Sequence, residues 1–242
     1  MTQVIASPSR YIQGKGEIGN LCKYAANFGK KLCILTSASG RKRVEDQIVS
    51  GQKDSGVEIQ FEVFNGECCM TEISRISDML KQSGCDMIAG VGGGKIHDTA
   101  KAAGYYTGLP VLIVPTIAST DAPCSALSVI YTDEGVFEKY LFLPSSPNVV
   151  LVDTDIVSKA PARLLVSGMG DALATYFEAR ACKQSNADNC VGGKCTQAAM
   201  ALAELCYDTL MEYGLNAASA ADEKVCTKAV ENIIEANTYL SG

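Results

Sequence analysis

The feature that most constrains the fold of this 242-residue chain is a regular alternation of short apolar runs with amphipathic stretches, ending near residue 115. Short apolar runs predict strands, and apolar residues three or four positions apart predict helices. We expect strands at 32–36, 57–64, 86–91 and 110–115, and helices at 41–55, 71–83 and 95–106. Strands that alternate with helices are typical of an α/β fold with a parallel sheet covered by helices on both faces.

The pattern changes after residue 115. Residues 127–131 and 139–143 flank a short polar turn and predict a β-hairpin, and 148–153 predicts one more strand. Beyond Pro161 the spacing predicts only helices, at 163–183, 195–213 and 218–239, with breaks at Gly192-Gly193 and Tyr213-Gly214. We therefore expect an α/β domain at 1–160 and an all-α domain at 161–242. Three helices with broad apolar faces make a poor closed domain, so this second domain is expected to be incomplete.

Charge and hydropathy exclude several kinds of partner. The formal net charge is -6 and the sequence pI is about 4.9, so the surface repels nucleic acid. No apolar run reaches the about 18 residues of a membrane-spanning helix, and the first residues do not resemble a signal peptide. We expect a cytoplasmic protein with no membrane contact. The eleven cysteines include no Cys-x-x-Cys pair, which predicts buried reduced thiols rather than disulfides.

A glycine-rich turn, Gly90-Val91-Gly92-Gly93-Gly94-Lys95, lies between a predicted strand and a predicted helix. The first N–H groups of a helix are unpaired and carry the positive end of its dipole, and Lys95 would add a cation. Glycines there would let a pyrophosphate approach the backbone. The alternative is a plain tight turn.

Two further segments carry acidic side chains. The segment 116–123 follows the next strand, is rich in hydroxyls and contains Asp121. It would suit a phosphate, a nicotinamide or a polyol. The alternative is a hydrogen-bonded loop in which Asp121 caps a helix. Asp171 follows two glycines and is either a ligand or an ordinary helix cap. The one histidine, His97, is expected to be a surface or phosphate-side residue near the glycine turn rather than a metal ligand.

Six segments occur together in the order found in one enzyme family. They are Gly-Gly-Gly-Lys-x-x-Asp-Thr-Ala-Lys (92–101), Pro-Thr-Ile-Ala-Ser-Thr-Asp-Ala-Pro (115–123), Ser-Ala-Leu-Ser-Val-Ile-Tyr (125–131), Ala-Pro-Ala-Arg-Leu-Leu (160–165), Gly-Asp-Ala-Leu-Ala-Thr (170–175) and Glu-Ala-Asn-Thr-Tyr-Leu-Ser-Gly (235–242). By these motifs the chain resembles the glycerol dehydrogenases of the iron-containing alcohol dehydrogenase superfamily. The resemblance implies a Rossmann-like dinucleotide-binding domain followed by the first part of an all-α metal-binding domain.

The resemblance also implies roles for individual residues. The dinucleotide would be contacted by Ser37, Gly93, Gly94, Lys95, Thr116, Ser119, Ser125, Leu127 and Tyr131. Asp121 would bind the substrate hydroxyls, and Asp171 would be one ligand of a divalent ion, zinc. Family members supply two histidine ligands from beyond the Leu-Ser-Gly at which this sequence ends, so the zinc site is expected to be incomplete here.

Ser37 departs from the family pattern. The family has an aspartate at this strand end, suited to the hydroxyls of the adenine ribose. Here Ser37 lacks that charge, and Arg41-Lys42-Arg43 follows. The basic residues are either a solvated helix start or partners for a 2′-phosphate. We expect NAD as the cofactor, with NADP tolerated.

The activity that the resemblance implies is oxidation of glycerol to dihydroxyacetone by metal-assisted hydride transfer to NAD, in a homo-oligomer. Two alternatives stay open. One is a catalytically inactive remnant that still binds a dinucleotide. The other is a different polyol or alcohol dehydrogenase of the same superfamily.

Overall fold

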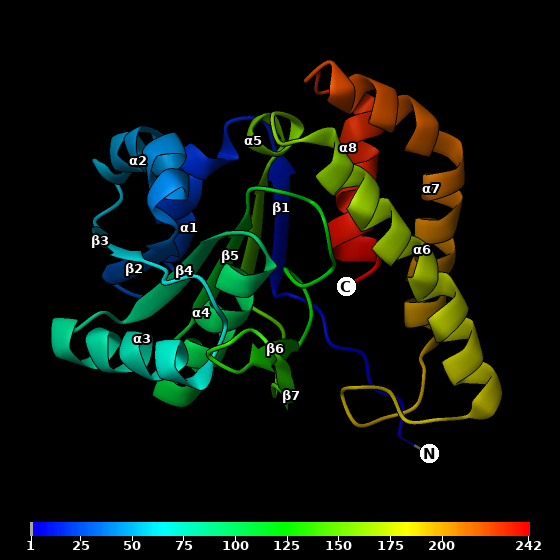
Figure 1. Cartoon of the computed structure of the whole chain (residues 1–242), viewed down its shortest axis with the longest axis horizontal. Coiled ribbons are helices and arrows are strands. Elements are labelled where there is room, and N and C mark those ends of the chain that lie inside the picture. The colour runs from blue at the N-terminus through cyan, green and yellow to red at the C-terminus, as the bar shows by residue number, and fades with distance from the viewer. Residues whose placement is uncertain (1) are drawn as a thin grey trace.

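A six-stranded parallel sheet forms the frame of the computed structural model, which describes residues 2–242 (Figure 1). Its strands are β1 (Arg10–Gly14), β2 (Lys31–Thr36), β3 (Glu58–Val63), β4 (Met87–Gly92), β5 (Val111–Pro115) and β8 (Val149–Asp153). They lie in the order β1-β8-β5-β4-β2-β3, and every neighbouring pair is parallel. The α/β fold class and the Rossmann-like parallel sheet are confirmed.

The strand order creates a switch point between β2 and β4. The chain leaves β2 for β3 on one side, whereas it leaves β4 for β5 on the other, and β2 and β4 are themselves paired. In open parallel sheets, ligands bind in the crevice outside the carboxyl ends of strands at such a point. Ser37 follows β2 and Gly93 follows β4, so both lie at this crevice.

Alternate residues of each strand enter the two cores of the sheet, as the two-residue period of a strand requires. Leu32 and Ile34 pack with helices α1 (Leu21–Ala25) and α2 (Ala38–Gln52). Cys33 and Leu35 pack with α3 (Met70–Ser83) and α4 (Gly94–Thr107). The two helix pairs cover opposite faces (Figure 1). Burial on both faces explains why these strands are continuous apolar runs.

The sequence did not predict strand β1. It pairs along β8, from Arg10 beside Val149 to Gly14 beside Asp153, at one edge of the sheet. None of its residues is fully buried, and its polar residues break any apolar run. Helix α2 also begins earlier than predicted, because the Ser37 hydroxyl accepts a hydrogen bond from the Gly40 N–H at 3.0 Å and caps the helix.

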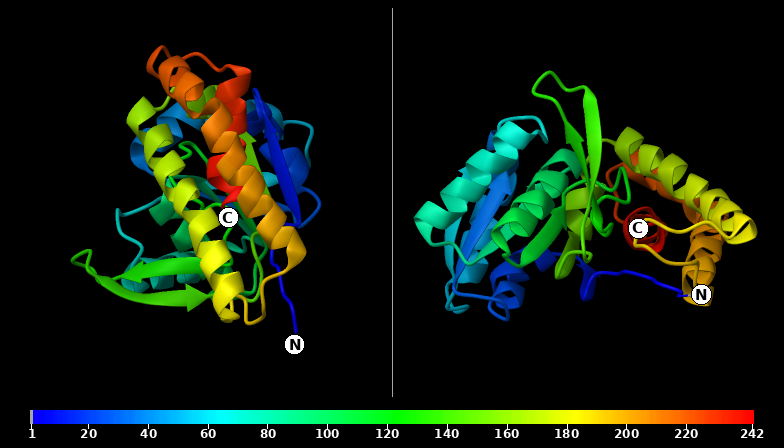
Figure 2. Two further views of the ribbon diagram at one scale, coloured as in Figure 1. Left: turned by 90° about the vertical axis from the view of Figure 1, so that its right-hand side faces the viewer. Right: turned by 90° about the horizontal axis from the view of Figure 1, so that it is seen from below.

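The predicted hairpin is present. It comprises β6 (Leu127–Tyr131) and β7 (Phe137–Phe142), which pair antiparallel with an irregularity at Ile130 and Tyr131. In the right-hand view of Figure 2 the hairpin stands between the parallel sheet and the helices of the carboxyl-terminal part. The hairpin therefore borders the region between the two halves of the chain.

Helices follow the last strand. They are α5 (Thr154–Ser158), α6 (Ala162–Ser185), α7 (Gln197–Asp222), α8 (Lys228–Glu235) and a π-helix, η2 (Ala236–Leu240); a 3-10 turn, η1 (Glu17–Asn20), precedes α1. Within residues 2–242 all strands lie before Thr154, and only helices follow, as the sequence predicted for the part beyond Pro161. The division into domains at 1–160 and 161–242 stays a prediction.

The helix break predicted at Tyr213-Gly214 is wrong. Helix α7 runs through Gly214 to Asp222, and the chain turns only at Lys224, whose φ is 58°. A glycine inside a helix costs only about 1 kcal/mol relative to alanine, which packing of a long helix offsets. Thr227 then caps α8 by accepting from the Val230 N–H.

The burial predicted for the cysteines is confirmed for seven of the eleven. Cys182, Cys195 and Cys226 are half-buried and Cys190 is exposed, all in the helical part or its connections. All eleven are free thiols. None of the helices formed by residues 2–242 combines the length and the apolar character that crossing a membrane requires.

Candidate functional site

The glycine turn after β4 leaves open space where helix α4 begins. A Cβ atom at Gly90 would lie 2.8 Å from Ala100 Cβ and 3.1 Å from the Ile96 carbonyl oxygen, so packing requires that glycine. One at Gly92 would lie 2.5 Å from Ile96 Cδ1, the end of a side chain that can shift. At Gly94 the nearest atom would be 3.6 Å away, an ordinary contact. Packing therefore does not require Gly94, and the space over the unpaired first N–H groups of α4 suits an anion.

The loop after β5 lies directly on this turn, since the Thr116 N–H donates to the Gly92 carbonyl at 2.9 Å. The loop after β5, the start of α4 and the β6–β7 hairpin enclose a pocket of about 370 Å³. It is lined by Gly94, Lys95, Asp98, Ser119, Thr120, Asp121, Ala122, Ser125, Leu127, Val129 and Tyr131. Seven of the predicted site residues thus come together from three separate segments.

The four other predicted residues, Gly93, Thr116, Ser37 and Asp171, lie outside the lining of this pocket. Gly93 is the N-cap residue of α4, directly before the pocket residue Gly94. Thr116 is in the loop that lines the pocket and bonds that loop to the glycine turn. Ser37 lies one strand away, at the carboxyl end of β2. A ligand that spans the switch point would have to reach from the pocket across β4 to meet Ser37.

Lys101, a buried residue that the sequence analysis did not single out, donates hydrogen bonds to the loop and to the hairpin that line the pocket. The Lys101 ammonium donates to the Ala122 carbonyl at 2.9 Å and to Ser125 Oγ at 3.1 Å, and also to the Leu127 carbonyl. It pairs with Asp98 Oδ1 at 2.9 Å, and its side chain is 1% exposed. The three-residue spacing of Asp98 and Lys101 in the predicted helix was the available signal.

Asp98 completes this arrangement. Its Oδ2 accepts the Val129 N–H at 3.1 Å, so the carboxylate links α4 to the hairpin. Burial raises the pKa of Asp98, and the Lys101 charge opposes that rise. A buried ion pair is stable only when its remaining polar atoms are also satisfied, as they are here.

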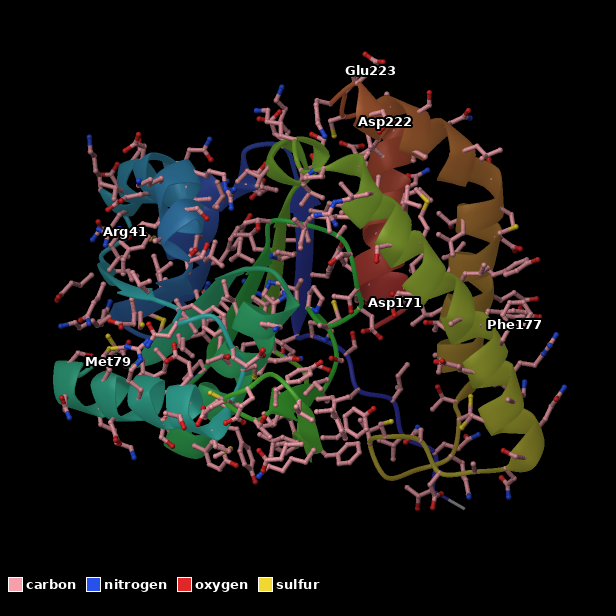
Figure 3. All side chains as sticks on the ribbon, in the orientation of Figure 1. Arg41, Met79, Asp171, Phe177, Asp222 and Glu223 are labelled. Atoms are coloured by element: carbon pink, nitrogen blue, oxygen red, sulfur yellow. The ribbon has the colours of Figure 1, made fainter. Side chains whose placement is uncertain are left out.

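Asp121 and Asp171 meet at the junction between the pocket and helix α6. The Asp121 N–H donates to Asp171 Oδ2 at 3.2 Å, and Figure 3 labels Asp171 on α6. Burial, and then the negative charge of Asp171, raise the pKa of Asp121 to about 6. A cation placed beside the two carboxylates would offset both effects.

The helix-capping alternatives for these two residues are wrong. Asp171 lies well inside α6, and Asp121 is followed by an irregular loop that leads to β6. Residues 2–242 nevertheless contain no group of three His, Cys, Asp or Glu side chains that could hold a metal ion. Because a catalytic metal takes about three protein ligands, these residues do not form a complete metal site.

The surface position predicted for His97 is wrong. The residue is only 1% exposed, because the first turn of α4 packs onto β4 and β5. Burial, and then the Lys101 charge, lower the pKa of His97 to about 3, so the ring is neutral. Within residues 2–242 neither ring nitrogen has a hydrogen-bond partner.

The basic residues after Ser37 differ in availability. Arg41, which is labelled in Figure 3, forms an ion pair with Glu45 at 2.6 Å. It also lies over the Phe61 ring, 4.7 Å from its centroid. Arg43 is exposed, and its Nη2 lies 3.9 Å from where a Cβ at Gly40 would be. Among residues 2–242, therefore, Arg41 has a charged partner, whereas Arg43 lies beside the start of α2 without one.

The raised pKa of Asp121 predicts how stability depends on pH. The folded state favours the protonated carboxyl, so its contribution is fully present below the ordinary value of 3.8 and is lost as pH rises through about 6. Asp121→Asn should therefore raise the free energy of unfolding at pH 8 by about 1–3 kcal/mol. The gain should shrink as pH falls from 6 towards 4.

Urea unfolding at a series of pH values measures this effect. Asp54→Asn, at an exposed position near the end of α2, is the matched control and should change stability little at any pH. A gain for Asp121→Asn that stays constant between pH 8 and pH 4 would show that the carboxylate charge is not the cause.

Comparison with known proteins identifies the family of the chain. The model of the family described as iron-containing alcohol dehydrogenase matches residues 8–154. The chain is 52% identical over 242 residues to a glycerol dehydrogenase of Escherichia coli O6:H1, covering 100% of the chain and 66% of that relative. It is 44% identical over 242 residues to a glycolaldehyde reductase of Halobacterium salinarum, with the same two shares.

A solved structure agrees. The crystal structure of a probable glycerol dehydrogenase from Sinorhizobium meliloti 1021 superposes with a TM-score of 0.94 at 46% identity, covering 100% of this chain and 66% of that one. The chain thus spans 66% of the length of these relatives. Because the family model matches more than half of its residues, this chain belongs to the iron-containing alcohol dehydrogenase family.

Proposed function

We propose that this chain binds NAD at the carboxyl edge of its sheet and serves the NAD-dependent oxidation of glycerol to dihydroxyacetone. The observation that carries the proposal is the pocket at the start of α4, where Gly94, Lys95 and Asp121 meet. The glycerol dehydrogenase relative supports the choice of polyol. The domains at 1–160 and 161–242, a cytoplasmic location and a homo-oligomer belong to the same proposal.

The dinucleotide fits the described residues. Its pyrophosphate would lie over Gly93 and Gly94, where the N–H groups of α4 are unpaired and Lys95 supplies a positive charge. Hydroxyl and backbone groups of Thr116, Ser119, Ser125 and Leu127, with the ring of Tyr131, would complete its contacts. The adenine end would extend towards Ser37, across the switch point.

Asp121 would orient the polyol. Its carboxylate lines the same pocket and can accept hydrogen bonds from two neighbouring hydroxyls. Oxidation transfers a hydride from carbon 2 of glycerol to the nicotinamide ring, and the hydroxyl on that carbon loses its proton. Zinc is the proposed metal, with Asp171 as one ligand. The described residues supply too few ligands for us to assign them any metal-dependent step.

A second candidate is reduction of glycolaldehyde with the reduced dinucleotide. The Halobacterium salinarum relative favours it, and glycolaldehyde also carries two neighbouring oxygens that Asp121 could orient. The third candidate is a dinucleotide-binding chain without turnover.

The initial rates of NAD reduction by glycerol and of NADH oxidation by glycolaldehyde, measured with the full-length protein, distinguish the three candidates. Glycerol with NAD should form NADH, and Asp121→Asn should lower kcat/KM for glycerol by about tenfold or more, the effect of losing a charged hydrogen bond. A higher kcat/KM for glycolaldehyde reduction would favour the second candidate. NADH binding without turnover of either compound would favour the third.

Ser37 predicts relaxed cofactor selection. Without an aspartate there, nothing on β2 repels a 2′-phosphate, and Arg43 lies beside it. NADPH should bind within about tenfold of NADH, a gap of at most about 1.4 kcal/mol. Ser37→Asp should restore the NADH preference while keeping the helix cap, because aspartate is also a good N-cap residue.

Fluorescence titration of both reduced cofactors at one ionic strength tests this prediction. Ser50→Asp adds the same charge to an exposed position near the other end of α2 and is the control. The role of Ser37 is contradicted if NADPH binds a hundredfold more weakly than NADH, or if the two aspartate variants behave alike.

A further inference from the structure

An acidic residue outside the pocket neutralises its lysine. Lys95 Nζ lies 2.6 Å from Glu67 Oε2, on the loop that joins β3 to α3. The other oxygen, Glu67 Oε1, accepts the Cys68 N–H at 2.8 Å. The Glu67 side chain is 18% exposed and the Lys95 side chain 54%. The carboxylate is therefore held in place, and the lysine is the partner that can move.

The loop that carries Glu67 is fixed to the hairpin. The Cys68 carbonyl accepts the Tyr131 N–H at 2.9 Å, and Lys95 Nζ lies 5.5 Å from the centroid of the Tyr131 ring. Lys95 and Tyr131 line the pocket of the proposed dinucleotide, whereas Glu67 is not among the residues that line it. Any effect of Glu67 on a ligand in this pocket must therefore pass through Lys95 or through its own charge.

We propose that Glu67 competes with the pyrophosphate of the dinucleotide for Lys95 and so weakens cofactor binding from outside the pocket. The proposal rests on the dinucleotide site proposed above. An ammonium already paired with a carboxylate attracts a phosphate less, because the carboxylate offsets its charge. When the cofactor enters, Lys95 must either break its ion pair with Glu67 or contact Glu67 and the pyrophosphate at the same time. The same exchange would ease release of the cofactor, and release of a product limits turnover in many enzymes.

Glu67→Gln tests the inference, because glutamine has the same size and can still accept the Cys68 N–H. The variant should bind NADH about two- to fivefold more tightly at low salt, the range expected for one exposed ion pair. The gain should shrink at higher ionic strength, since salt screens the exposed charges. ADP-ribose, which has the same pyrophosphate and no nicotinamide, should show the same gain.

Two comparisons make the result specific. Glu62→Gln removes a carboxylate that pairs with Arg75 at 2.5 Å outside the pocket, and it should leave NADH affinity unchanged. In a Lys95→Met background, Glu67→Gln should lose most of its effect, because the two residues act as one pair. A mere folding defect in Glu67→Gln would weaken binding rather than strengthen it.

The inference about Glu67 is overturned if Glu67→Gln leaves NADH affinity unchanged or lowers it. It is equally overturned if the gain persists in full in the Lys95→Met background, or if it occurs with NADH and not with ADP-ribose. If the unchanged chain binds neither NADH nor ADP-ribose, the proposed dinucleotide site fails together with the inference. Binding that Glu67→Gln does not tighten overturns the inference alone.

Discussion

The buried ammonium of Lys101 determines the shape of the candidate site. It has acceptors on the loop that follows β5 and on the first residue of the hairpin, and it pairs with Asp98 on its own helix. The loop and the hairpin start at 122–127 are therefore held to α4, more than 20 positions earlier in the chain, by one cation. Removing either partner of a buried pair leaves an uncompensated charge, which costs about 3–5 kcal/mol. The positions of Ser125, Leu127 and Asp121 depend on this pair.

The charged groups in and beside the pocket are of opposite sign at its two ends. Lys95 and the N–H groups of α4 attract anions at one end, and Asp121 with Asp171 forms a negative pair at the other. Burial, and then the negative charge of Asp171, raise the pKa of Asp121. Glu67 adds a carboxylate beside Lys95 and so balances its charge. The pocket thus suits a dinucleotide at one end and a polar substrate at the other.

The sequence predicted those parts of the structure that depend on local pattern. Buried parallel strands such as 86–91 are visible as apolar runs, and the glycine turn after it is visible as composition. Strand β1 was not predicted because an edge strand needs only half-buried residues. His97 was placed on the surface because one residue says nothing about which turn of α4 the sheet covers. The role of Lys101 depends on the carbonyls of Ala122 and Leu127, more than 20 positions away, which no local pattern reveals.

The seven site residues that line the pocket were named by resemblance, and their convergence on one pocket supports that reading. Ser37 is at the predicted strand end, but only the strand order reveals that β2 and β4 are neighbours at the switch point. The pairing of Arg41 with Glu45 and of Lys95 with Glu67 could not be predicted, because each depends on side-chain reach between elements or turns.

Hydrogen exchange of the chain with and without NADH tests the central claim, that the dinucleotide binds over the glycine turn. Bound NADH should slow amide exchange in residues 92–98 and 116–127, where the ligand would cover or fix the backbone. Helix α7, Gln197–Asp222, should exchange at an unchanged rate because it lies outside the pocket. Protection confined to other segments, or no protection at NADH concentrations that saturate the fluorescence titration, would contradict the account.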